Sequence, residues 1–214
     1  MVTTRSRTAG TTASSTASST AAAASTKKTT SSSAATSKPA SAPKKTTAAA
    51  AAAPTSSKAL SVGDALPEST PELTVHSGKE GETTSLGALV DASAKGIVVF
   101  FYPAANTPGC TNQAKLFQEN LSKFTDKGYT VYGCSKDKPA AQTKWHTKLS
   151  LDYDLLTDTN SDTAELVGLL KQPGRKMSRG VAIIDKDGGR KVVFAGAYGP
   201  QASVDEALKF VGAA

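Results

Sequence analysis

Residues 96–103 read Gly-Ile-Val-Val-Phe-Phe-Tyr-Pro, a nearly continuous apolar run that ends in proline. A run of this kind is typical of a central strand in a sheet that is covered on both faces. Residues 130–135 (Thr-Val-Tyr-Gly-Cys-Ser) predict a second buried strand. Between the two strands, apolar residues recur from Ala114 to Phe124 at the spacing of one helix face. We therefore expect a sheet with helices packed against it.

The alternation of strands and helices continues beyond residue 135. Lys138–Leu149 predicts a helix, Leu155–Thr157 a short strand, and Thr163–Leu170 a further helix. The first of these helices has a proline near its start, a position at which proline is well tolerated.

A hairpin and a last helix complete the predicted order of elements. The apolar runs 181–185 and 191–194 flank Asp187-Gly-Gly189, and Asp-Gly at this place is a strong hairpin signal. Ser203–Glu206 has the spacing of a capping box, which predicts the start of the last helix. The order predicts an α/β, thioredoxin-like fold, with a central mixed β-sheet flanked by helices.

Residues 1–58 differ sharply in composition from the rest of the chain. They are almost wholly Ala, Ser, Thr, Lys and Pro, they contain no aromatic residue, and no Asp or Glu precedes Asp64. Such a stretch cannot bury enough apolar area to offset the entropy lost on ordering it. We predict a disordered, basic tail over residues 1–58 and one folded domain over residues 59–214.

The positive charge of the chain lies in this tail. The chain has 25 Lys and Arg against 18 Asp and Glu, and its net charge is +7. Eight of the basic residues fall in residues 1–58, which leaves 17 against 18 acidic residues in the domain. Any attraction to nucleic acid must therefore come from the tail, and we expect DNA contact without sequence specificity.

The tail also carries signals for location in the cell. Lys-Lys pairs at 27–28 and 44–45 lie among Pro, Ala, Ser and Thr, as in linker-histone tails, and favour the nucleus. Arg5 and Arg7, with abundant serine and no acidic residue, also fit a mitochondrial transit peptide. We predict the nucleus, with the mitochondrion or the cytoplasm as alternatives.

Cysteine usage and hydropathy narrow the class of protein further. Two cysteines, Cys110 and Cys134, do not make a disulfide scaffold. The longest strongly apolar run, Ile97–Tyr102, is too short to span a membrane. We expect a protein of a reducing compartment with no membrane attachment.

The stretch most informative about chemistry is Tyr102–Gln113, which reads Tyr-Pro-Ala-Ala-Asn-Thr-Pro-Gly-Cys-Thr-Asn-Gln. Thr107 is a good N-cap residue, and Pro108 suits the first helical position. Cys110 then falls in the first turn, where free backbone N–H groups and the helix dipole favour an anion. The sequence thus predicts a nucleophilic thiolate, with the Thr107 hydroxyl nearby. The alternative is a small buried core cysteine.

The spacing of residues 103–110, Pro-x-x-x-Thr-x-x-Cys, matches the signature of the peroxiredoxins. The longer run resembles the peroxiredoxin Q, or bacterioferritin comigratory protein, branch, and the resemblance covers roughly residues 60–212. The basic extension is similar to that of fungal nuclear thiol peroxidases of this branch. Further matching positions are Gly133-x-Ser-x-Asp137, Leu155-Leu-Thr-Asp158, and Arg179 placed six residues before Asp185.

The resemblance implies a role for each matching residue. Cys110 would attack a peroxide oxygen and become a sulfenic acid. Thr107 would hydrogen-bond the peroxide oxygens, and Pro103 would shield the oxidised sulfur. Arg179 would stabilise the thiolate and the charge on the leaving oxygen, although a solvated charge at a strand edge is the alternative for this residue.

The resemblance also implies substrates and partners. Hydrogen peroxide and alkyl hydroperoxides would be the substrates, and no metal, flavin or haem would be needed. Thioredoxin would be the reductant, with glutathione or glutaredoxin as alternatives, and the protein would be a monomer. A different function, based on the tail, is a chromatin-associated redox sensor that binds DNA.

Two positions depart from the pattern of the family. Many relatives carry a resolving cysteine five residues after the reactive one, where this chain has Lys115, and often an acidic residue at the position of Gln113. Cys134 is the other candidate for a resolving cysteine, and it would need local unfolding to reach Cys110. We therefore predict a mechanism with one cysteine, in which Cys134 is a buried structural residue.

Overall fold

The computed structural model describes residues 59–77 and 81–214. The predicted tail, residues 1–58, lies outside the described residues, so its disorder stays a prediction. The strands are β1 (Glu72–His76), β2 (Glu82–Ser85), β3 (Gly96–Phe101), β4 (Tyr129–Ser135), β5 (Leu155–Thr157), β6 (Leu170–Lys171), β7 (Lys176–Met177), β8 (Gly180–Asp185) and β9 (Lys191–Gly196). The helices are α1 (Leu86–Ala92), α2 (Pro108–Glu119), α3 (Leu121–Thr125), α4 (Pro139–Leu149), α5 (Asp162–Leu166) and α6 (Pro200–Val211).

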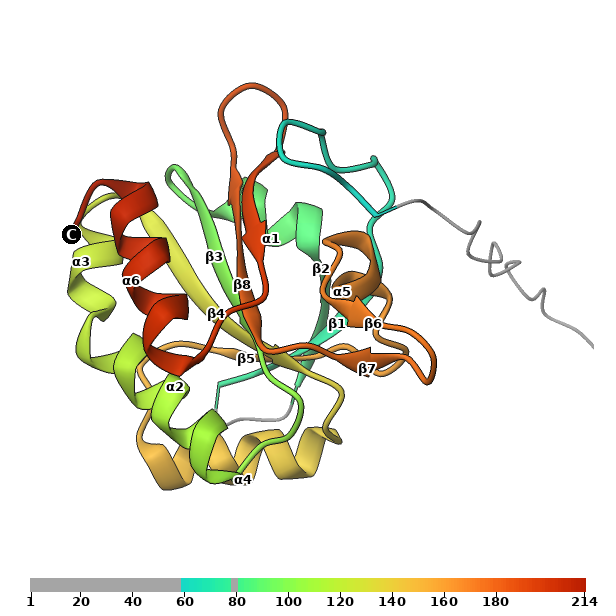
Figure 1. The fold of residues 1–214 in the computed structure, drawn as a ribbon, viewed down its shortest axis with the longest axis vertical. Helices are drawn as coiled ribbons and strands as arrows, with labels where there is room; N and C mark the ends of the chain where they lie inside the picture. Colours follow the sequence, from blue (N-terminus) through green and yellow to red (C-terminus); the bar gives the residue numbers. More distant parts are fainter. Residues whose placement is uncertain (1–58, 78–80) are drawn as a thin grey trace, which may run out of the picture. The chain divides into compact units, whose positions relative to one another are not determined.

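Seven strands form one mixed sheet in the order β2-β1-β5-β4-β3-β8-β9. The central strands β3, β4 and β5 run parallel to one another, whereas β1, β2, β8 and β9 join by antiparallel pairing. The short strands β6 and β7 pair separately, and this small hairpin leads into β8. The prediction of a thioredoxin-like fold with a mixed sheet is confirmed (Figure 1).

The apolar run at residues 96–103 becomes the central strand β3, whose residues Ile97–Phe101 have no exposed surface. Successive side chains of a strand point to opposite faces of its sheet. Val98 and Phe100 accordingly join an apolar cluster with side chains from α2, α3, α4 and α6. Val99 and Phe101 join a second cluster with side chains from α1 and α5. Figure 1 shows α2, α3 and α6 on one side of the sheet, and α1 and α5 on the other.

The single helix predicted from Ala114 to Phe124 is instead two helices, which meet at Asn120. The Asn120 side chain donates to the carbonyl of Leu116 at 2.9 Å, and its own backbone N–H donates to the same carbonyl. Asparagine side chains that bond the nearby backbone compete with a regular helix. The buried face is nevertheless kept, since Phe117 and Phe124 both have no exposed surface.

The helix predicted over Thr163–Leu170 ends early, at Leu166. Gly168 has φ +72°, and its N–H donates to Glu165 while that of Leu169 donates to Ala164. This pair of bonds around a left-handed glycine is the Schellman motif, which ends helices. The chain then enters β6, which the sequence pattern did not predict, as was also the case for β1, β2, α1 and β7.

The capping box predicted at Ser203 is wrong, because α6 begins earlier, with Gly199 as its N-cap and Pro200 as its first residue. Ser203 lies inside the helix, is buried, and donates its hydroxyl to the carbonyl of Gly199 at 2.7 Å. Proline at the first helical position needs no N–H partner, which explains the earlier start. In the described part of the chain, no helix is long and apolar enough to cross a membrane.

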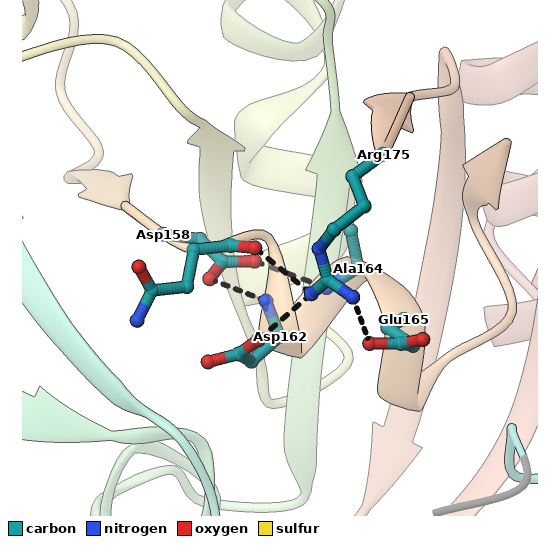
Figure 2. A network of polar contacts seen from close by, with 6 residues as sticks. Asp158, Asp162, Ala164, Glu165 and Arg175 are labelled. Atoms are coloured by element: carbon teal, nitrogen blue, oxygen red, sulfur yellow. Dashed lines mark hydrogen bonds and ion pairs between the residues drawn. The ribbon is translucent and has the colours of Figure 1, made fainter. Parts of the chain in front are cut away.

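Asp158, directly after β5, fixes the start of α5. Its two carboxylate oxygens accept the backbone N–H groups of Asp162 and Ala164 at 2.9 and 3.0 Å. Arg175, from the turn between β6 and β7, pairs with Asp162 at 2.9 Å and with Glu165 at 2.7 Å (Figure 2). These contacts tie the β6–β7 hairpin to α5. Burial raises the pKa of Asp158 to about 6, even though the two backbone bonds oppose that rise.

This pKa predicts a pH dependence of stability. Between about pH 4 and pH 6 the folded protein holds a proton on Asp158 that the unfolded chain has lost. The free energy of unfolding from this group is therefore largest below pH 4 and falls by up to about 3 kcal/mol as the pH rises to 6. Urea denaturation of wild type and Asp158→Asn at several pH values measures this slope. The slope is expected to disappear in Asp158→Asn but to persist in Asp126→Asn, at an exposed aspartate, and an unchanged slope in Asp158→Asn would contradict the prediction.

Candidate active site

Cys110 lies in the first turn of α2, directly after the loop that leaves β3. Thr107 is the N-cap, with an extended backbone (φ −94°, ψ 154°), and Pro108 takes the first helical position. Thr111 donates its N–H to the carbonyl of Thr107 at 2.8 Å, which closes the first turn. The N–H groups of Gly109 and Cys110 precede this bond, so the helix offers them no carbonyl. The predicted helix start is confirmed, and its positive end lies at the residue that carries the thiol.

Arg179, which lies between β7 and β8, places its guanidinium across this first turn. Its Nη2 donates to the Cys110 Sγ at 3.4 Å, and its Nη1 donates to the carbonyl of Gly109 at 3.1 Å. A Cβ atom on Gly109 would lie 3.1 Å from Nη2, so glycine leaves room for the guanidinium here. Arg179 is half-buried rather than fully solvated. The fold thus brings a cation and a thiol together across 69 positions of sequence.

Gln113, one turn further along α2, holds the same guanidinium from its other side. Its Oε1 accepts from Arg179 Nη1 at 2.8 Å. Its Nε2 donates to the carbonyl of Gly180 at 3.4 Å and to the hydroxyl of Ser203 at 3.3 Å. Gln113 has no exposed surface, so water does not compete for these bonds. The sequence marked Gln113 only as a departure from relatives, although its spacing of three residues from Cys110 placed both on one helix face.

Thr107 and Pro103, the other two predicted site residues, lie in the loop that precedes Cys110. The Thr107 hydroxyl donates to the carbonyl of Ala104 at 3.1 Å and does not cap the helix. Pro103 is exposed. Direct contact with the sulfur therefore comes from Arg179, while Thr107 stands at the helix end three residues before Cys110. The roles of Thr107 and Pro103 in chemistry stay predictions.

Cys134 lies in β4 on the opposite face of the sheet from Cys110. It packs in the cluster that contains Phe101, whereas Cys110 packs in the cluster that contains Phe100. Both thiols are free, and both are wholly buried. Burial, with a smaller contribution from the charge of Asp158, raises the pKa of the Cys134 thiol well above its ordinary value. The sheet itself separates the two sulfur atoms, which favours the interpretation of Cys134 as a structural cysteine.

A comparison with protein families finds that the model of the AhpC/TSA family matches residues 62–192. The chain belongs to the AhpC/TSA family. Its relatives include peroxiredoxin bcp1 of Schizosaccharomyces pombe, 32% identical over 152 residues, which are 71% of this chain and 74% of that protein. The chloroplastic peroxiredoxin Q of Gentiana triflora is 35% identical over 131 residues, and the match spans 58% of each of the two chains.

A solved structure of a similar protein agrees with this fold. The peroxidoxin BcpB of Mycobacterium tuberculosis superimposes with a TM-score of 0.58 at 28% identity, over 70% of this chain and 97% of that one. The resemblance to the peroxiredoxin Q branch that rested on the motif around Cys110 is therefore confirmed. Membership of the peroxiredoxins indicates a peroxidase, which is an oxidoreductase.

The contacts of Gln113 generate a prediction for this AhpC/TSA site. Gln113→Ala removes the side-chain acceptor of Arg179 and the amide that donates to the Gly180 carbonyl and the Ser203 hydroxyl. We expect a loss of about 1–3 kcal/mol in the free energy of unfolding, and a fall of about tenfold in the rate of Cys110 oxidation by hydrogen peroxide because the guanidinium is no longer held. Urea denaturation and stopped-flow oxidation measure the two effects. Lys115→Ala, on the exposed face of α2, should change neither, and wild-type reactivity in Gln113→Ala would refute the role.

Proposed function

We propose that this peroxiredoxin reduces hydrogen peroxide and small alkyl hydroperoxides through Cys110 alone. The observation that carries the proposal is the 3.4 Å contact between the Arg179 guanidinium and the Cys110 sulfur at the start of α2. A cation and the positive end of a helix at one sulfur stabilise negative charge on it when it acts as a nucleophile.

In the first step the Cys110 thiolate attacks one oxygen of the peroxide, and the O–O bond breaks. Cysteine is oxidised to a sulfenic acid, the peroxide is reduced, and the other oxygen leaves as water or an alcohol after it takes up a proton. Arg179 is positioned to stabilise both the thiolate and the negative charge on the leaving oxygen. The Thr107 hydroxyl would hydrogen-bond the bound peroxide, and Pro103 would limit access of water to the sulfenic acid.

In the second step an external thiol reduces the sulfenic acid. Its sulfur attacks that of Cys110 and releases water, and a second thiol then cleaves this mixed disulfide and restores Cys110. The buried position of Cys134 across the sheet supports an external rather than an internal thiol. We propose thioredoxin as the reductant, with glutathione or glutaredoxin as alternatives. Cys110 has no exposed surface, so the first turn of α2 must open before a protein reductant reaches it.

The test is a peroxide titration with thiol counting and intact mass on wild type, Cys110→Ser, Cys134→Ala and Arg179→Ala. Wild type and Cys134→Ala should gain one oxygen atom and lose one thiol, whereas Cys110→Ser should consume no peroxide. Arg179→Ala should react about 100-fold more slowly, because it lacks the charge that faces the sulfur. Alanine is chosen at position 134 because serine would bury a hydroxyl among apolar side chains.

Two results would contradict separate parts of this proposal. If wild type loses two hydrogen atoms and both thiols, Cys134 resolves Cys110 and the one-cysteine mechanism is wrong. If Cys110→Ser consumes peroxide at the rate of wild type, the peroxidase function of this site is wrong.

We also propose that the protein acts in the nucleus as a monomer, and that residues 1–58 bind DNA without sequence specificity. Eight basic residues and no acidic residue in this segment support that binding. Removal of residues 1–58 should leave peroxidase activity within about twofold of the full chain, while retention on DNA–cellulose at low salt is lost. Each protein is measured in both assays, and elution by salt serves as the control for charge. Undiminished DNA retention by the shortened protein would exclude the tail as the binding segment.

A further inference from the structure

The loop between β3 and α2 is bonded to the end of β4 by one short contact. The backbone N–H of Ala105 donates to Asp137 Oδ2 at 2.6 Å. Asp137 lies just after β4, 32 positions further along the chain, and is half-buried. The bond holds the loop about midway between the buried Tyr102, which directly follows β3, and Thr107, which is the N-cap of α2.

Asp137 is itself held by Ser135, which has no exposed surface. The Ser135 hydroxyl accepts from the N–H of Asp137 at 3.1 Å and from Gln142 Nε2 at 2.8 Å. Both partners are donors only, so the hydroxyl hydrogen must point to Asp137 Oδ2, 2.8 Å away. Oδ2 therefore accepts two hydrogen bonds, one from Ser135 and one from the loop.

The same network also reaches Tyr102, at the start of the loop. Tyr102 donates its hydroxyl to Gln142 Oε1 at 2.6 Å, and both residues have no exposed surface. A continuous path of hydrogen bonds thus runs from Tyr102 through Gln142, Ser135 and Asp137 to Ala105. The bonds among Tyr102, Gln142 and Ser135 are buried, so water cannot replace them, whereas the bonds of Asp137 to Ser135 and Ala105 are half-buried. The buried end of the path therefore holds Ser135, and through it Asp137, in place.

The backbone of the loop depends on such support. Asn106, next to Ala105, has φ +59°, a left-handed conformation that asparagine adopts more readily than most residues but less readily than glycine. Within residues 59–77 and 81–214, its side chain has one hydrogen-bond partner, the exposed Lys148, whose Nζ donates to Asn106 Oδ1 at 2.8 Å. The Thr107 hydroxyl bonds the Ala104 carbonyl within the loop, and the bond between Ala105 and Asp137 ties the loop backbone to the segment that follows β4.

We propose that Asp137 is a positioning residue for peroxide reduction. By fixing Ala105, its carboxylate sets the direction in which Thr107 and the free N–H of Cys110 face an incoming peroxide. The proposal rests on the peroxidase function argued above and adds a residue that does not touch Cys110. Small misplacements of groups that orient a substrate cost large factors in rate.

The test compares Asp137→Ala, Asp137→Asn and Thr157→Val in a Cys134→Ala background. Asparagine retains an oxygen that accepts both bonds, whereas alanine does not. Thr157→Val removes the 3.0 Å bond from the Thr157 hydroxyl to the Asp137 carbonyl and the 2.9 Å contact of the same hydroxyl with His76 Nε2, but it leaves the bond to Ala105 intact. It is therefore the control for the loss of other polar contacts beside Asp137. The measurements are the rate of single-turnover oxidation by hydrogen peroxide and the pH midpoint of thiolate absorbance in the ultraviolet.

Asp137→Ala should react about 10- to 100-fold more slowly with hydrogen peroxide, with an unchanged thiolate midpoint because Arg179 and Gln113 still hold the sulfur end. Asp137→Asn and Thr157→Val should stay within about threefold of the parent protein. A rate in Asp137→Ala close to that of the parent overturns the proposal. So does a fall in rate accompanied by a shifted thiolate midpoint, since that result means collapse of the helix start.

Should Asp137→Ala not fold, Ser135→Ala decides the question, because it removes one of the two donors that orient the carboxylate. A fall in rate of at least about threefold supports the proposal, and an unchanged rate overturns it. If the peroxidase function itself is wrong, hydrogen peroxide will not oxidise Cys110 in the Cys134→Ala parent protein. If only the role of Asp137 is wrong, the parent protein will still be oxidised.

Discussion

The rest of this site depends on the contacts that the Arg179 guanidinium makes. It joins the Cys110 sulfur, the Gly109 carbonyl and the Gln113 amide in one cluster, although it comes from a segment that precedes β8. For this contact to exist, β8 must pair with β3 in register, because that pairing brings Gly180 opposite Phe101 at the end of β3. The mixed sheet therefore positions the site as well as burying apolar side chains. Arg179 directly precedes β8, which pairs antiparallel with β3, and Cys110 follows β3, which pairs parallel with β4.

Much of this arrangement follows from local sequence, and the remainder does not. The run at residues 96–103 predicts the central strand because a continuous apolar segment must be covered on both faces. Thr107, Pro108 and Cys110 predict the helix start because capping chemistry acts within a few residues. The sequence marked Gln113 only as a departure from relatives and did not predict its contacts, since its partners Arg179, Gly180 and Ser203 come from distant parts of the chain. Its bonds appear only once α2, β8 and α6 are packed together.

The errors in the predicted elements have related causes. Ser203 fits a capping box by spacing, yet Pro200 begins the helix earlier and the serine hydroxyl serves Gln113 instead. Asn120 interrupts a helix whose apolar spacing is unbroken, because spacing describes which face is buried and not whether the backbone bonds continue. Apolar periodicity therefore gave the packing correctly in places where it gave the boundaries wrongly.

The separation of the two thiols by the sheet has a consequence for the rate at which thiol reagents modify Cys134. Cys134 sits in a closed apolar cluster, and burial suppresses its ionisation, so reagents that need a thiolate cannot modify it in the folded state. Its labelling rate is then governed by how often the core opens. Labelling of Cys134 therefore measures the opening of the core on the face of the sheet opposite Cys110.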